Sequence, residues 1–250
     1  MIVETLIGQQ RFSFDTSQGI EVSVRLDATE VGPNCFYAPP FDASPLVSGS
    51  FIGDTRKGSP VNFYNVKLNP HGNGTHTECV GHISEERIAI ADVLKDSLFW
   101  SRLVSIYPEK LENGDKVITA QSLQEIAAQL KDETAILIRS LPNPEEKNRW
   151  MYSGSNPTYF EPEAIELLVK AGIQHLLTDL PSVDREEDGG KLLAHKTFWN
   201  YPLEINRNNT ITEMIYVSNE VDDGQYLVQI QIPSFQLDAA PSRVFLYKPK

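Results

Sequence analysis

Buried strands alternate with helices in the middle of the chain, and this alternation constrains the fold more than any other feature. An apolar run at residues 103–107 predicts a strand, and Ser122 to Leu130 has the periodicity of an amphipathic helix. A short buried strand is expected at 135–139, a second helix from Pro162 to about Lys170, and a further buried strand at 173–180. Strand-helix-strand units of this kind are typical of α/β domains.

The remainder of the chain adds strands and loops. Alternating apolar residues from Arg11 to Asp27 predict a hairpin with its turn at Ser17 to Gly19. A strand is expected at 61–68, and three more follow in the last third of the chain, at 210–217, 226–232 and 243–247. No repeat or linker-like change of composition divides these segments, so the sequence predicts a single compact α/β domain over residues 1–250, with a mixed sheet and packed helices.

The composition excludes several classes of partner. A formal net charge of -12 argues against a nucleic acid or an anionic membrane surface, because both require a basic face on the protein. No segment approaches the roughly 20 apolar residues of a membrane helix, and the N-terminus lacks a secretory signal. The two cysteines, Cys35 and Cys79, cannot form a disulfide framework, and a cytoplasmic protein is expected.

Three of the five histidines lie within the twelve residues from His71 to His82, together with Glu78 and two glycines that follow His71. Imidazole and carboxylate ligands together suit zinc, manganese or iron. His76 and Glu78 are two residues apart, so both project on one face if the backbone is extended there. The glycines after His71 can bend the chain so that this histidine rejoins the pair. The cluster therefore predicts a metal site, and with it an enzyme.

The spacing leaves a second ligand set open. The pattern His76-x2-Cys79-x2-His82 would present two imidazoles and one thiolate to a zinc ion. Structural zinc sites usually draw on paired knuckles of cysteine or histidine, and this chain offers no second knuckle. Loss of the metal in a Cys79→Ser variant would support this alternative.

Two loops stand out beside the cluster. Residues 32–41 are rich in proline and aromatic side chains, so they are expected to cover a pocket or meet another subunit. Phe36 and Tyr37 of this loop, and Trp199 farther along the chain, are candidates for stacking on a planar substrate, with core or interface packing as the alternative. The charged loop from Asp184 to Gly190 is expected to be exposed.

The histidine cluster resembles the signature of the cyclase family of metal-dependent hydrolases, which includes bacterial kynurenine formamidase and isatin hydrolase. That signature is His-x-Gly-Thr-His-x-Asp-x-Pro-x-His, and it is similar to the run from Gly74 through His76 and Glu78 to His82. The resemblance covers about Val61 to Tyr247 and includes later motifs in the family's order, at Asn156-Pro157, Thr178 to Asp184, His195, Thr210 to Glu213 and Ala240 to Arg243.

This resemblance implies a swivelling β/β/α fold with a barrel-like core, holding one or two Zn²⁺ or Mn²⁺ ions. His82 matches the family's proton-transfer histidine. The positions that match or stand near the family's metal ligands are His71, His76, Glu78, His195 and Glu213.

Three departures from the family pattern are visible. His71 lies five residues before His76, whereas the family has four, and Gly72 occupies the expected place. Glu78 stands where the family has an aspartate. An insertion at 199–204 separates the later ligands. Together these departures suggest a subgroup whose substrate differs from formylkynurenine, the substrate of the tryptophan-catabolism enzymes.

The expected activity is hydrolysis of an amide, either an aryl formamide or a cyclic amide. The chemistry is that of metal-activated water, with His82 as general acid and base. The alternatives are a lactone or ester hydrolase using the same site, and a member of the fold that binds a metal or ligand without catalysis. The expected partner is a small-molecule substrate, and the family implies a homodimer or higher homo-oligomer.

Overall fold

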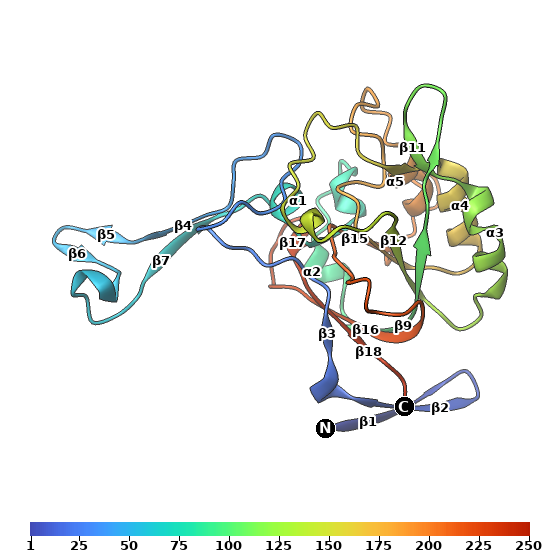
Figure 1. Ribbon diagram of the computed structural model, residues 1–250, viewed down its shortest axis with the longest axis horizontal. Coiled ribbons are helices and arrows are strands. Elements are labelled where there is room, and N and C mark those ends of the chain that lie inside the picture. Colours follow the sequence, from blue (N-terminus) through green and yellow to red (C-terminus); the bar gives the residue numbers. More distant parts are fainter.

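A nine-stranded sheet forms the centre of the computed structural model, which describes residues 1–250 (Figure 1). Its strands are β3 (Ile20–Glu21), β8 (His76–Cys79), β9 (Leu98–Ile106), β12 (Ala135–Ser140), β14 (His175–Thr178), β15 (Thr210–Glu213), β16 (Gly224–Gln231), β17 (Ala239–Pro241) and β18 (Arg243–Tyr247). They lie in the order β17-β8-β15-β14-β12-β9-β16-β18-β3. The four middle strands from β15 to β9 are parallel, and β8 and β16 flank them in the antiparallel direction. The predicted mixed sheet is confirmed, and each strand expected after residue 100 overlaps one of these.

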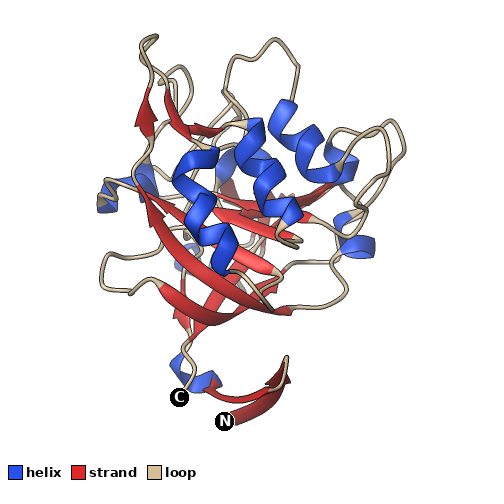
Figure 2. Ribbon diagram, turned by 90° about the vertical axis from the view of Figure 1, so that its right-hand side faces the viewer, coloured by secondary structure: helices blue, strands red, loops and turns tan.

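Three helices cover one face of this sheet (Figure 2). They are α3 (Ala120–Gln129), α4 (Pro162–Lys170) and α5 (Leu193–Trp199), and the single turns α1 (Pro70–Asn73) and α2 (Ile90–Val93) complete the set. The Thr119 side chain caps α3 by accepting from the Ser122 amide at 3.3 Å, which fixes the start of that helix. Both predicted helices are confirmed. None of the helices has the length and apolar character needed to span a membrane.

The hydrophobic core lies on both faces of the sheet. Side chains alternate along a strand, so Ile136 and Ile138 of β12 pack on the helix side while Leu137 packs on the other. On that other side the sheet curls, and Leu137 belongs to the same cluster as Val228 of β16 and Leu246 of β18. The chain is therefore a single compact α/β domain, as predicted.

An arm projects from the body of the molecule (Figure 1). In it β4 (Asp42–Pro45) pairs with β7 (Tyr64–Lys67), and β5 (Val47–Ser48) pairs with β6 (Phe51–Ile52). The strand predicted at 61–68 corresponds to β7. A further small sheet beside α3 contains β10 (Glu109–Lys110), β11 (Lys116–Ile118) and β13 (Tyr159–Phe160).

The prediction of a hairpin between Arg11 and Asp27 is wrong. The hairpin is formed instead by β1 (Ile2–Ile7) and β2 (Gln10–Asp15), with Gly8 at a φ of +57° in its turn. After β2 the chain makes one 3-10 turn and enters β3, which pairs with β18 of the central sheet. The period-two pattern identified extended segments on both sides of the turn, but alternation does not say which strand is the partner.

Candidate metal centre

The segment that carries the first histidines folds tightly before it enters the sheet. Asn69 caps α1 by accepting from the Gly72 amide at 3.1 Å, and Pro70 occupies the first turn. Gly74 then adopts a φ of +154°, a conformation that a side chain would disfavour, and the chain turns into β8. This tight fold brings His71 back over β8, as the sequence predicted.

Strand β8 lies between β17 and β15, and all four of its side chains are buried. Because the strand is extended, His76 and Glu78 project on the same face. The register places Glu213 of β15 directly opposite His76. A residue from the last third of the chain thus joins the cluster through ordinary strand pairing.

His195 reaches the cluster from α5. Its Nε2 lies 3.0 Å from Oε1 of Glu78, and its Nδ1 donates to Oδ2 of Asp184 at 2.6 Å. Asp184 also accepts from the backbone amides of Ala194 and His195, so its carboxylate holds the first turn of α5 as well as the imidazole. The structure therefore brings together all five residues expected as metal ligands.

The ligand atoms of this group lie close together, but not all of them form hydrogen bonds. His71 Nδ1 lies 3.0 Å from Glu78 Oε2, and His76 Nε2 lies 3.3 Å from Glu213 Oε2. Even so, His76 Nε2 and Glu78 Oε2 are buried atoms that make no hydrogen bond. Unpartnered buried polar atoms are rare in proteins, and a bound water or ion is one of the explanations for such atoms.

The donor set fits a divalent ion. His71, His76 and Glu78 each offer one atom, and these atoms lie within 4.8 Å of one another; Glu78, His82 and His195 form a second such group. Nitrogen and oxygen donors of this kind suit zinc and related transition metals. His71, His82 and Asp238 form a third group, and Glu78 is shared by the first two.

Electrostatics around Glu78 favour its charged form. Burial raises the pKa of the Glu78 carboxyl, but the imidazoles of His82, His195 and His71 outweigh burial and hold that pKa well below its usual range. Burial lowers the pKa of His195, yet the hydrogen bonds to Asp184 and Glu78 raise it to about 10. Each carboxylate attracts positive charge, and a metal ion supplies that charge as well as a proton does.

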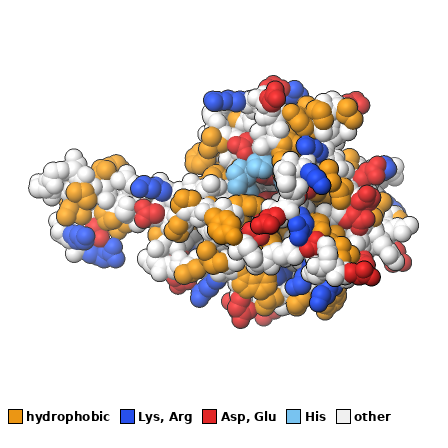
Figure 3. Space-filling model, turned by 90° about the horizontal axis from the view of Figure 1, so that it is seen from above, with side chains coloured by type: hydrophobic (Ala, Val, Ile, Leu, Met, Phe, Trp, Pro, Cys, Tyr) orange, Lys and Arg blue, Asp and Glu red, His pale blue; other side chains and the backbone are white.

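His82 lies at the open side of the cluster. It ends the short turn Val80–His82, and its Nδ1 lies 3.8 Å from Glu78 Oε2 and 3.4 Å from Asp238 Oδ2. Its side chain is 30% exposed and that of His71 is 24% exposed, whereas His76 and His195 are buried. Figure 3 accordingly shows histidine side chains in a hollow of the surface.

The residues expected to contact substrate occupy different environments. Phe36 and Tyr37 are exposed, at 45% and 78%, on the early loop. Trp199 is fully buried: its Nε1 donates to the Asn209 carbonyl at 2.9 Å, and its ring packs beside His195. A side chain enclosed in this way faces the core, so Trp199 supports His195 and does not stack on a substrate.

The zinc site with Cys79 is not formed. Adjacent residues of a strand face opposite sides, so Cys79 points away from Glu78 and packs in the core beyond the sheet. Its Sγ donates to the Ile88 carbonyl, and no group of clustered ligand atoms includes a cysteine. Burial raises the pKa of the Cys79 thiol to about 11, which disfavours the thiolate that zinc requires.

Sequence reasoning missed two carboxylates of the site. Asp184 is expected from the sequence on an exposed charged loop, but it is buried against His195. The run of acidic residues after Asp184 is typical of a solvated loop. The available signal was the position of Asp184 at the end of the family motif from Thr178 to Asp184. Asp238 lies 2.8 Å from Nε2 of His71, and in the sequence it stands two residues before the motif from Ala240 to Arg243, outside it.

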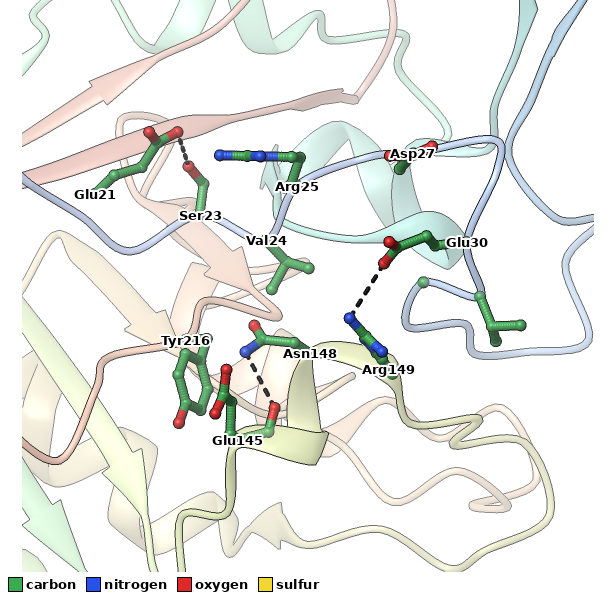
Figure 4. Close-up of a pocket in the computed structure, with 12 residues that line it drawn as sticks. Glu21, Ser23, Val24, Arg25, Asp27, Glu30, Glu145, Asn148, Arg149 and Tyr216 are labelled. Atoms are coloured by element: carbon green, nitrogen blue, oxygen red, sulfur yellow. Dashed lines mark hydrogen bonds and ion pairs between the residues drawn. The ribbon is translucent and has the colours of Figure 1, made fainter.

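An open pocket lies apart from this centre. It has a volume of about 580 Å³ and lies between the segment 21–32 and the turn Glu145–Arg149 (Figure 4). Charged side chains pair across it, as Arg149 does with Glu30 at 3.1 Å. None of the expected metal ligands lines this pocket.

Solved structures with the same fold include several hydrolases. The predicted metal-dependent hydrolase from Bacillus stearothermophilus is 17% identical, with a TM-score of 0.63 over 92% of this chain and 98% of that chain. Isatin hydrolase A from Labrenzia aggregata is 13% identical, with a TM-score of 0.65 over 93% and 94%. Isatin hydrolase A from Ralstonia solanacearum is 10% identical, with a TM-score of 0.64 over 92% and 91%.

The sequence itself matches a family model. The model of the Cyclase family aligns with residues 17–185, a span that contains the cluster from His71 to His82 and extends past Asp184. This span is more than half of the chain. The protein therefore belongs to the Cyclase family.

Proposed function

We propose that this protein is a metal-dependent hydrolase that cleaves the C–N bond of an amide, either an aryl formamide or a cyclic amide. The observation that carries the proposal is the pair of buried, unpartnered atoms, His76 Nε2 and Glu78 Oε2, beside the partly exposed His82. Zn²⁺ or Mn²⁺ is the proposed ion. Cyclic amides are included because isatin, named in three solved structures of this fold, is one.

The residues of the metal centre have two proposed roles: some hold the ion, and one moves a proton. His71, His76, Glu78, His195 and Glu213 would hold the ion. When bound, such an ion polarises a carbonyl and lowers the pKa of a coordinated water to about 7. Glu213 is itself fixed, because its Oε1 accepts from the Val183 amide at 2.9 Å while Oε2 faces His76.

His82 is proposed to move the proton. Its Nδ1 faces the carboxylates of Asp238 and Glu78, which favours a proton on that nitrogen and leaves the lone pair on Nε2. With its lone pair unengaged, Nε2 is able to take a proton and return it to a leaving nitrogen. Its partial exposure gives a substrate access to it.

Metal analysis followed by a substrate panel tests the proposal. Purified wild-type protein and a His76→Gln variant are compared for bound metal and for hydrolysis of aryl formamides, cyclic amides and lactones, with and without chelator. His175→Gln is the matched control, since His175 is a buried histidine on β14 that is absent from every group of clustered ligand atoms.

The expected result is metal and amide hydrolysis in wild type and control, with both lost in His76→Gln. Full activity after chelation would overturn the proposal. Metal without turnover of any acyl substrate would favour a binding protein instead. Turnover of lactones alone would assign the site to ester chemistry.

A further inference from the structure

Each buried histidine of the metal centre has a defined partner for its outer ring nitrogen. Nδ1 of His76 donates to the Gly74 carbonyl at 3.0 Å, which leaves Nε2 facing the centre. Nδ1 of His195 donates to Asp184, which again leaves Nε2 inward. A metal-ligating histidine is ordinarily fixed in this way, because the outer hydrogen bond sets both the tautomer and the ring orientation.

His71 follows the same rule with the two nitrogens exchanged. Its Nε2 lies 2.8 Å from Oδ2 of Asp238, and its Nδ1 lies 3.0 Å from Glu78. An ionised carboxylate can only accept, so the proton is on Nε2 and, once a metal replaces the second proton, the lone pair of Nδ1 faces the centre.

Backbone hydrogen bonds tie Asp238 to the neighbouring strand of the sheet. Its carbonyl accepts from the Cys79 amide at 3.0 Å, and the preceding carbonyl, of Leu237, accepts from the Ile90 amide at 2.8 Å. The next residue, Ala239, pairs with Glu78 as β17 begins. The backbone of Asp238, in the bend just before β17, is therefore hydrogen-bonded to β8, the strand that carries His76 and Glu78.

We propose that Asp238 is a positioning residue that makes His71 a metal ligand through Nδ1. It offsets the single extra residue between His71 and His76, because it orients the displaced ring toward Glu78. The same Oδ2 lies 3.4 Å from Nδ1 of His82, so one carboxylate restrains both a ligand and the proposed proton carrier. This inference rests on the proposed function only in that the centre binds a divalent ion.

The test is a double-mutant cycle read as metal affinity. The wild type, Asp238→Ala, His71→Ala and the double variant are stripped of metal, and Zn²⁺ affinity is measured by competition with a chromophoric chelator. Absorption of the Co²⁺-loaded proteins reports the ligand geometry, and neither readout requires turnover. Asp15→Ala is the matched control, since Asp15 is a partly buried aspartate (23% exposed) on the terminal hairpin, away from the centre.

We expect Asp238→Ala to weaken Zn²⁺ binding by about 10- to 100-fold and to change the Co²⁺ spectrum, with no further loss when it is added to His71→Ala. Unchanged affinity and spectrum would overturn the inference. Additive losses would also overturn it, because they would make Asp238 a direct ligand. Thermal unfolding of the metal-free variants shows whether each one folds. If the wild type binds Zn²⁺ but hydrolyses no substrate, the proposed function fails and the role of Asp238 is still decided.

Discussion

The carboxylate of Asp184 accepts a 2.6 Å hydrogen bond from Nδ1 of His195 and lies on the opposite side of the imidazole from Glu78. We predict that Asp184→Asn weakens metal binding by about 10- to 100-fold. A neutral amide raises the basicity of the imidazole less than a carboxylate does, and it does not fix the orientation of the ring in the same way. Metal competition with a chromophoric chelator measures this change.

The control for that variant lies in the same loop. Asp188 caps the backbone amides of Gly190 and Leu192, and it has no contact with the imidazole. Asp188→Asn should therefore leave metal affinity within about twofold of wild type. Equal losses in the two variants would mean that loop order, and not the contact with His195, controls binding.

Gly72 explains why the first histidine is displaced. A Cβ atom placed on Gly72 would lie 2.2 Å from the Cβ of Ala38, so residue 72 has no room for any side chain. We predict that Gly72→Ala lowers the free energy of unfolding by about 1–3 kcal/mol, as overpacking usually does. Urea denaturation measures the loss.

A second substitution checks the cause of that loss. Ala38→Gly removes the atom that the new methyl group at position 72 would meet, although the Cys35 carbonyl would remain 3.3 Å away. The double variant should recover most of the stability lost in Gly72→Ala, relative to Ala38→Gly alone. No recovery would show that the Cys35 carbonyl, and not the contact with Ala38, excludes a side chain at residue 72.

The helices and central strands could be predicted because local patterns determine them. Residues 162–170 begin with a proline, carry an acid in the first turn and bury one face, so sequence periodicity is sufficient. The hairpin was misplaced because partner choice depends on distant packing: Phe12 packs against Trp100, with ring centroids 4.7 Å apart. No local pattern in residues 11–27 records that contact.

In the metal centre, too, some residues could be predicted from the sequence and others could not. His76 and Glu78 could be paired from their spacing on a strand, and His195 and Glu213 from the family resemblance. Asp238 could not be found, because it reaches His71 only through the pairing of β17 with β8, across 167 residues of chain. For Trp199 the sequence left stacking on a substrate and core packing both open, because an aromatic residue beside a ligand looks the same in either case, and its full burial fits the core alternative.

The projecting arm is expected to contact a second copy of the chain. Its apolar side chains Val47, Val61, Phe63 and Val66 are each more than half exposed, which is unusual for a hairpin without a partner. Replacing residues 46–62 by a short turn that joins β4 to β7 should convert a dimer or higher oligomer into a monomer in light scattering. A wild-type protein that is monomeric at micromolar concentration would contradict this expectation.

The buried histidine outside the centre gives a pH dependence of stability. Burial lowers the pKa of His175 from 6.5 to about 4, and its Nδ1 is hydrogen-bonded to the Thr210 hydroxyl at 2.9 Å. Below pH 6.5 the unfolded chain binds a proton that the folded protein does not accept until about pH 4. The contribution of neutral His175 to stability is therefore present above pH 6.5 and falls as the pH drops toward 4, by about 2 kcal/mol at pH 5.

His175→Gln isolates this contribution, since glutamine does not titrate and every other group, the metal centre included, titrates alike in both proteins. Urea denaturation of the two proteins at about pH 7.5 and pH 5 gives the difference directly. The wild type should lose about 2 kcal/mol more than the variant between these pH values. Parallel losses in the two proteins would mean that His175 is protonated in the folded state. A charged ring there would need a negatively charged partner, whereas its neighbours are the Thr210 hydroxyl and the Phe99 ring.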